Sequence, residues 1–282
     1  HNAVMRPLVQ LERQGVSFDR VPCDTEGRMD ISALSGLVRP NTRLVLIAHA
    51  SNVSGTVQDA EAVGKICTAY GIPFALDAAQ SAGHMDVDFT RFGLSALVVP
   101  GHKGLLGPQG IGALLLSPEL AQQLTPLIAG GTGSASDSEE LPEWMPDRFE
   151  SGTPNLPGIY GWETALGFIE RTGIESLESH EKDLTARFLD GLAELKNVCV
   201  YGPKCIEGRT GVVSVGFKKR DNAEAAWLLE SEYGVLTRCG LHCAPAAHRS
   251  LGSFPEGSVR FSLGYANTES DVDGALRAIA AL

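Results

Sequence analysis

The sequence predicts an α/β unit followed by a smaller α+β unit, and two observations support this fold class. Between residues 43 and 116, short apolar runs flanked by Gly and Pro alternate with a helical pattern, which is typical of a sheet covered by helices on both faces. Beyond residue 170, amphipathic helical patterns are mixed with alternating strand patterns. We therefore predict a large domain over residues 1–170 and a small C-terminal domain over residues 171–282.

The elements of the large domain follow from the spacing of its apolar residues. The runs predict a strand, a helix and three further strands, at residues 43–48, 60–70, 72–76, 97–99 and 111–116. Residues 130–142 are rich in Gly, Ser and acidic side chains, so they predict a surface loop. In such a fold, ligands bind at the carboxyl ends of the strands.

In the small domain, helical spacing returns before the strands do. Helices are predicted at residues 157–172, 174–195 and 222–233, and strands at 211–217 and 259–263. Thr268 and Asp271 have the spacing of a capping box, which predicts that the final helix starts there.

Composition narrows the classes of function. The 282 residues carry 23 basic and 34 acidic side chains, a formal net charge of -11, which disfavours nucleic acid and anionic membranes as partners. The apolar runs are too short to cross a bilayer. Six scattered cysteines do not form a disulfide framework, so we expect at least some free thiols. The acidic net charge favours a small-molecule substrate, and the short apolar runs favour a cytoplasmic protein. Because the chain opens at His1 within an apolar segment, we also expect that something precedes it.

Two residues at predicted strand ends point to a cofactor. Asp77 ends a strand that we expect to be buried, and Lys103 lies between glycines just after another strand. Alone, Asp77 suits a cap or a structural ion pair, and Lys103 suits a solvated loop. Together they match the needs of pyridoxal 5'-phosphate (PLP), which takes a lysine on its aldehyde and an acid on its pyridine nitrogen.

Three segments extend this match to a family. The sequence DAAQ at 77–80, GHKGLLGPQGIG at 101–112 and RFESGTPN at 148–155 resemble the class V aminotransferases of PLP fold type I, and specifically the cysteine desulfurase and selenocysteine lyase branch. The similarity runs through essentially the whole chain. The resemblance implies a PLP-dependent transferase of fold type I whose large domain lacks its front segment here.

The resemblance also implies roles for individual residues. Lys103 would form the Schiff base with PLP, Asp77 would pair with the pyridine nitrogen, and Gln80 would donate to the ring hydroxyl. The remaining contacts would be His102 with the phosphate, His1 stacked on the ring, Asn52 near the ring, and Thr153 reaching the phosphate of a neighbouring subunit in a homodimer.

Two departures from the family pattern affect the phosphate site. Pro100 stands where relatives often have a phosphate-binding Ser, which removes a hydroxyl and an N–H donor. The family's first segment, which carries a Gly/Thr loop for the phosphate, has no counterpart upstream of His1. Both departures predict that this chain, taken alone, offers fewer hydrogen-bond donors to the phosphate.

The segment from Thr237 to His248 contains two cysteines and two histidines and allows three interpretations. It can be a zinc site, a pair of buried structural thiols, or an exposed loop with a reactive thiolate whose pKa is lowered by the charges of Arg238 and His242. The stretch resembles the R-x-G-x-H-C-A loop of the desulfurases, which places the nucleophile at Cys243 and not at Cys239. For the other four cysteines we expect structural packing.

An arginine in a predicted strand completes the set. Burying the charged guanidinium of Arg260 in a core would cost free energy, and a carboxylate partner would offset that cost. The partner is a structural Asp or Glu, or, by family resemblance, the substrate carboxylate, with Arg238 as a weaker substrate or phosphate contact.

These residues predict a cysteine desulfurase that converts L-cysteine to L-alanine and leaves a persulfide on Cys243, from which sulfur passes to a thiol or an acceptor protein. The catalytic residues would be Lys103, Cys243 and His1. The alternatives are a selenocysteine lyase, a Cys β-lyase, an aminotransferase, or a PLP-fold protein without activity, because cofactor residues do not fix the substrate.

Overall fold

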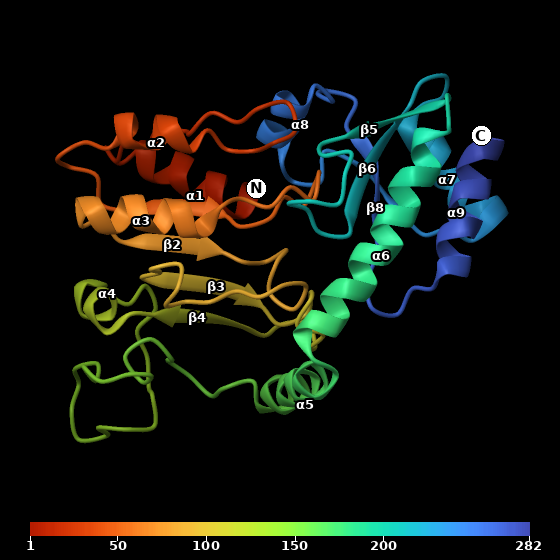
Figure 1. Ribbon diagram of the computed structural model, residues 1–282. Helices are drawn as coiled ribbons and strands as arrows, with labels where there is room; N and C mark the ends of the chain where they lie inside the picture. Colours follow the sequence, from red (N-terminus) through yellow and green to blue (C-terminus); the bar gives the residue numbers. More distant parts are fainter.

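A computed structural model describes residues 1–282 and contains two four-stranded sheets, each with its own hydrophobic core (Figure 1). The first sheet and its helices occupy one half of the molecule and the second sheet the other, with the N-terminus near their junction. The predicted mixed α/β class is confirmed. The predicted division between residues 170 and 171 stays a prediction, although the second core draws only on residues beyond it.

The first sheet has the strand order β1-β2-β3-β4. Its first three strands are parallel and the last is antiparallel to its neighbour. In the register, Asp77 lies beside Ala48 on one side and Val98 on the other, so the carboxyl ends of three strands meet at one edge. The strands are β1 (Val45–Ala48), β2 (Phe74–Asp77), β3 (Ala96–Pro100) and β4 (Gly112–Leu116).

Local sequence explains the helix that packs on this sheet. In α3 (Ala60–Tyr70), the Asp59 side chain accepts a hydrogen bond from the N–H of Ala62, and Gly71 ends the helix with a φ of 65°, which glycine adopts without strain. Val63 and Cys67 on one face are buried in the core with Phe74 of β2. The apolar spacing that predicted residues 60–70 is thus confirmed.

Three helices of this half were not predicted, and one expectation is wrong. The helices are α1 (Asn2–Glu12), α2 (Ile31–Leu37) and α4 (Pro118–Gln123), of which the last two are too short for a clear period. We expected the sheet to be covered on both faces, but β4 is an edge strand in which Leu114 and Leu115 are 54% and 44% exposed. An apolar run alone does not distinguish a central strand from an uncovered edge.

The second sheet is antiparallel, with the order β5-β6-β8-β7. Its strands are β5 (Val198–Tyr201), β6 (Val212–Phe217), β7 (Arg238–Gly240) and β8 (Ser258–Ser262). The helices of this half are α7 (Asn222–Tyr233), α8 (Pro245–Leu251) and α9 (Glu269–Ala281). The predicted capping box is confirmed, since Thr268 and Asp271 exchange hydrogen bonds at the start of α9.

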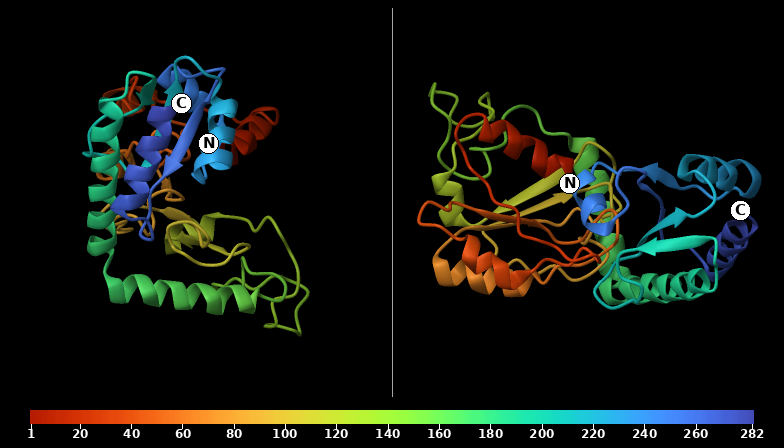
Figure 2. Two further views of the ribbon diagram at one scale, coloured as in Figure 1. Left: turned by 90° about the vertical axis from the view of Figure 1, so that its right-hand side faces the viewer. Right: turned by 90° about the horizontal axis from the view of Figure 1, so that it is seen from above.

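Two long helices connect the halves. The predicted helices correspond to α5 (Leu156–Thr172) and α6 (Ile174–Ala193), and the chain turns sharply between them at Gly173, whose φ is 85° (Figure 2). The segment before α5, which includes the predicted loop at 130–142, forms no regular helix or strand. No helix in the structure combines the length and the apolar character needed to cross a membrane.

Candidate active site

Three loops meet where the parallel strands end, and together they border a cavity of about 1130 Å³. The loop after β1 supplies Asn52, and the loop after β3 supplies His102 and Lys103. Asp77 is the last residue of β2, and the loop that follows it supplies Gln80. His1, at the start of α1, lines the same cavity. Six of the seven predicted cofactor residues therefore lie around one space, as expected for the carboxyl edge of a parallel sheet.

Asp77 is the acid of this cavity. Its Oδ1 accepts a hydrogen bond from the N–H of Ala79 at 3.0 Å, and it forms no ion pair. The alternative of a structural ion pair is therefore wrong. A carboxylate held by its own turn and open to the cavity remains available to a cationic partner.

Lys103 lies in a tight turn that begins after β3. Burial lowers the pKa of its amine, Asp77 raises it by a smaller amount, and Arg260 lowers it further. The net direction is downward, so the amine loses its proton more readily than a solvated lysine. The partial burial of this amine argues against an ordinary solvated side chain. The side chain has no hydrogen-bond or ion-pair partner within the protein, so the amine is available as a nucleophile.

Glycines allow this turn to pack against α5. The N–H of Gly107 donates to the carbonyl of Gly101 at 2.7 Å, and the indole of Trp162 lies against both residues. A Cβ at Gly107 would come within 2.6 Å of the Trp162 ring, so no other residue fits without movement. Sequence reasoning missed Trp162, because an aromatic residue on an amphipathic helix gives no sign of which turn it supports.

Asn52 joins the cavity to the second sheet. Its side-chain Nδ2 donates to the carbonyl of His242 at 2.7 Å, and its own carbonyl accepts from Arg260 at 3.1 Å. The residue predicted to lie near the cofactor ring therefore also contacts the loop of Cys243 and the predicted substrate arginine.

Arg260 lies in β8 with no acidic partner. Its Nε is buried and makes no hydrogen bond, and burial, with a smaller contribution from the neighbouring Arg238, lowers its pKa. The alternative of a structural Asp or Glu partner is wrong. Since buried guanidinium groups are costly unless paired, Arg260 is poised for an anion that the protein itself does not supply.

Hydrogen bonds to two backbone carbonyls hold the segment that carries Cys243. His242 and Cys243 have φ values of 48° and 58°, an uncommon backbone for residues other than glycine. Besides the bond from Asn52 to His242, the N–H of Asn2 donates to the carbonyl of Cys243 at 2.7 Å. The Cys243 side chain is exposed and its thiol is free, as the loop interpretation predicted.

One part of that interpretation is wrong. We expected a charged His242 to lower the pKa of the thiol, but burial, aided by Arg260 and His248, lowers the pKa of His242 to about 4. The imidazole is therefore neutral at pH 7, and Arg238 is the remaining cation on this segment. Burial of a histidine cannot be seen in a sequence whose local pattern indicates an exposed loop.

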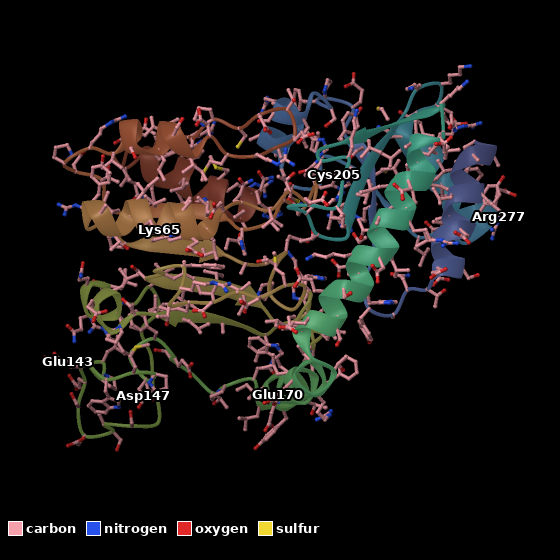
Figure 3. All side chains as sticks on the ribbon, in the orientation of Figure 1. Lys65, Glu143, Asp147, Glu170, Cys205 and Arg277 are labelled. Atoms are coloured by element: carbon pink, nitrogen blue, oxygen red, sulfur yellow. The ribbon has the colours of Figure 1, made fainter.

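The other cysteines differ in their settings. Cys67 is buried and Cys199 is half-buried, in keeping with structural packing. Cys23 and Cys205 are exposed, so the expectation of structural packing is wrong for both; Cys205 is labelled in Figure 3. Cys239 lies exposed in β7. No three His, Cys, Asp or Glu side chains converge as metal ligands, so the zinc alternative gains no support.

Four predicted site residues do not line the cavity, namely Thr153, Arg238, Arg260 and Cys243. Thr153 precedes α5 and is exposed, and its predicted contact with a neighbouring subunit stays a prediction. Arg238 faces Arg260 across the β7–β8 pair and does not line the cavity.

The residues of the cavity fit PLP by their chemistry. A lysine of lowered pKa, a carboxylate, an amide and an imidazole line one space. A half-buried arginine without an acidic partner, Arg260, lies close enough to affect the pKa of the lysine. Pro100 lines the cavity without an N–H or a hydroxyl, so the phosphate would have fewer donors there. Fold and site together define the class of PLP-dependent enzymes of fold type I.

Comparison with known proteins identifies the family within this class. The model of the aminotransferase class-V family matches residues 1–274, so the chain belongs to that family, whose members depend on PLP. The chain is 33% identical to a probable cysteine desulfurase of Methanothermobacter thermautotrophicus over 275 residues, and 34% identical to one of Pyrococcus abyssi over 278 residues. These alignments cover 96% and 97% of this chain and 68% of each relative.

Solved structures agree with this assignment. The apo cysteine desulfurase of Thermococcus onnurineus NA1 superposes with a TM-score of 0.93 at 33% identity, covering all of this chain and 70% of that one. The cysteine desulfurase CsdA of Escherichia coli gives a TM-score of 0.88 at 27% identity, with coverage of 99% and 69%. The resemblance seen in the sequence, to class V and to its cysteine desulfurase branch, is confirmed.

Proposed function

We propose that this protein is a PLP-dependent cysteine desulfurase. The observation that carries the proposal is the position of Asn52, which lines the cavity with Lys103 and Asp77 and also binds the loop of Cys243. One side chain therefore connects the cofactor residues to the residue that precedes an exposed thiol. The names of the similar proteins support the same activity.

The cofactor residues would contact different parts of the PLP molecule. Lys103 would bind its aldehyde carbon, Asp77 its pyridine nitrogen, and Gln80 its ring hydroxyl, while His102 would contact the phosphate. His1 and Asn52 would lie against the ring. When bound, PLP supplies an electron-withdrawing ring that stabilises negative charge at the substrate Cα.

The protein's own groups then act on L-cysteine. Arg260, whose guanidinium has no acidic partner in the protein, binds the substrate carboxylate. The amine of Lys103, deprotonated more readily because of burial, accepts the Cα proton, while Asp77 keeps a proton at the pyridine nitrogen. The Cys243 thiolate attacks the substrate sulfur, so that the carbon–sulfur bond breaks and a sulfur–sulfur bond forms. L-Cysteine becomes L-alanine, and Cys243 becomes a persulfide.

Formation of L-alanine tests this activity. The protein, supplied with PLP, is incubated with L-cysteine and a thiol reductant, and we expect alanine and sulfide in equal amounts. A Cys β-lyase would form pyruvate from L-cysteine in place of alanine, and an aminotransferase would convert amino acids that lack sulfur to keto acids. A selenocysteine lyase would also form alanine, so it is separated by comparing kcat/KM for L-selenocysteine with that for L-cysteine. Turnover without alanine would contradict the proposal.

Arg260→Lys is expected to weaken use of the substrate selectively. Lysine keeps a positive charge but loses the planar pair of donors, so the lost interaction with a carboxylate is worth about 1.5–3 kcal/mol, or roughly 10- to 150-fold in kcat/KM. The loss should appear mainly in KM for L-cysteine. The visible spectrum of bound PLP serves as the control and should not change. A variant with unchanged KM would contradict the role of Arg260.

We also propose a homodimer that acts on a small molecule and passes sulfur to a thiol or an acceptor protein. Large apolar side chains lie exposed on α5 and in the segment before it, among them Leu127 at 99%, Ile128 at 70% and Tyr160 at 65%. Thr153 lies in the same region, where a second subunit would bring it to the neighbouring cavity. Light scattering is expected to give twice the chain mass, and a monomer would contradict the dimer. A cytoplasmic location stays a prediction.

A further inference from the structure

A buried chain of hydroxyl groups leads from the first half of the molecule to His242, the residue before Cys243. The Oγ of Ser214 in β6 donates to the carbonyl of Val53 at 2.6 Å. The Oγ of Ser258 in β8 donates to the Oγ of Ser214 at 3.0 Å. The Nε2 of His242 lies 3.2 Å from both the Oγ and the carbonyl oxygen of Ser258. Both serines are fully buried.

This chain has only one consistent direction. The carbonyl of Val53 can only accept, so Ser214 must give it its single proton. Ser214 is then left to accept the proton of Ser258, and Ser258 has no proton to offer His242. The carbonyl of Ser258 likewise can only accept. Both contacts at Nε2 are therefore favourable only if Nε2 carries the proton.

The charge state of His242 agrees with this direction. Burial is the main cause that lowers the pKa of its imidazole to about 4; Arg260, His248 and Arg238 lower it further, and the bond to the Ser258 carbonyl raises it. At pH 7 the ring is neutral and carries one proton, which the chain places on Nε2. Nδ1 is left as an acceptor on the segment that carries the thiol.

We propose that Val53, Ser214 and Ser258 fix His242 as the neutral Nε2–H tautomer, and that His242 is thereby a positioning residue for Cys243. His242 and Cys243 share an uncommon backbone, and their two carbonyls are bound by Asn52 and Asn2. With the imidazole also anchored, the loop is held at three points. The effect on Cys243 rests on the proposed function, whereas the tautomer does not.

The tautomer can be measured directly. The protein, supplied with PLP and labelled with ¹⁵N-histidine, is studied at pH 7 by NMR, which separates protonated from unprotonated ring nitrogens; the signals of His242 are assigned by their loss in His242→Gln. We expect a single Nε2–H species. In Ser214→Ala, Ser258 regains a proton to offer, so a second, Nδ1–H population is expected. Ser253→Ala is the matched control, since it removes an equally buried hydroxyl that binds His248.

Two further variants, His242→Gln and His242→Asn, keep the test decisive if the serine variants fold poorly. The amide nitrogen of a glutamine reaches the place of Nε2, whereas that of an asparagine matches Nδ1. The rate of alkylation of Cys243, resolved from the other exposed thiols by peptide mass mapping, is expected to stay within about twofold in His242→Gln and to change more in His242→Asn.

Three results would overturn the proposal. These are an Nδ1–H tautomer in the unmodified protein, an unchanged tautomer in Ser214→Ala, and equal alkylation rates in His242→Gln and His242→Asn. None of them depends on desulfurase turnover. A protein that shows the expected tautomer but forms no alanine from L-cysteine would contradict the proposed function alone.

Discussion

Lys103→Ala is expected to abolish covalent attachment of PLP and to lower turnover of L-cysteine roughly 100- to 10,000-fold, the range for loss of a positioned proton acceptor. The reason is that Lys103 is the single lysine lining the cavity, and burial makes its amine more nucleophilic. The measurement is the visible absorbance of the protein after PLP is supplied, near the usual roughly 410–430 nm, together with the rate of alanine formation.

The matched control is Lys65→Ala. Lys65 lies on α3 with its side chain 74% exposed and paired only with Glu61, four residues earlier (Figure 3). An exposed pair of this kind contributes little to stability. Its removal should leave absorbance and turnover unchanged. A visible band retained in Lys103→Ala, or lost equally in both variants, would contradict the role of Lys103.

Cys243→Ala is expected to separate the binding of PLP and L-cysteine from the transfer of sulfur. The variant should keep the absorbance of bound PLP and still show a spectral change with L-cysteine, because no predicted cofactor residue is altered. Sulfide and alanine production should fall at least about 100-fold, because the nucleophile that accepts the sulfur is gone. Protein-bound persulfide, measured by mass spectrometry after a single exposure to L-cysteine, should be absent.

Cys239→Ala is the control for this variant. Cys239 is also an exposed, free thiol and lies four residues earlier in the chain, in β7. We expect it to keep persulfide formation and turnover. Persulfide on Cys239 in the unmodified protein, or undiminished sulfur release by Cys243→Ala, would show that the acceptor thiol has been assigned to the wrong residue.

Much of the cavity could be predicted from the sequence because its residues follow strands. Asp77 ends β2 and Lys103 comes three residues after β3, and the carboxyl ends of parallel strands share one edge. Gln80 and His102 are neighbours of these two and follow from the same reasoning. The helices with clear apolar spacing, such as α3 and α6, were also predictable.

The connections between the halves could not be predicted. Asn52 and His242 are 190 residues apart, and the acceptor is a backbone carbonyl, which every residue carries. The strands β5 and β7 have four and three residues, too few to show a period. The charge of His242 was wrongly predicted because its local sequence does not show how the chain folds back on it: Ser258 of β8, which contacts its ring, is 16 residues away.

The most direct test of the assignment is to find where PLP binds. Treatment of the PLP-loaded protein with borohydride makes the lysine linkage permanent, and peptide mass mapping then locates it. We expect the added mass on the peptide that contains Lys103 and on no other lysine. A linkage at a different lysine, or none after PLP has been supplied, would contradict the view that this cavity is the catalytic site of a PLP enzyme.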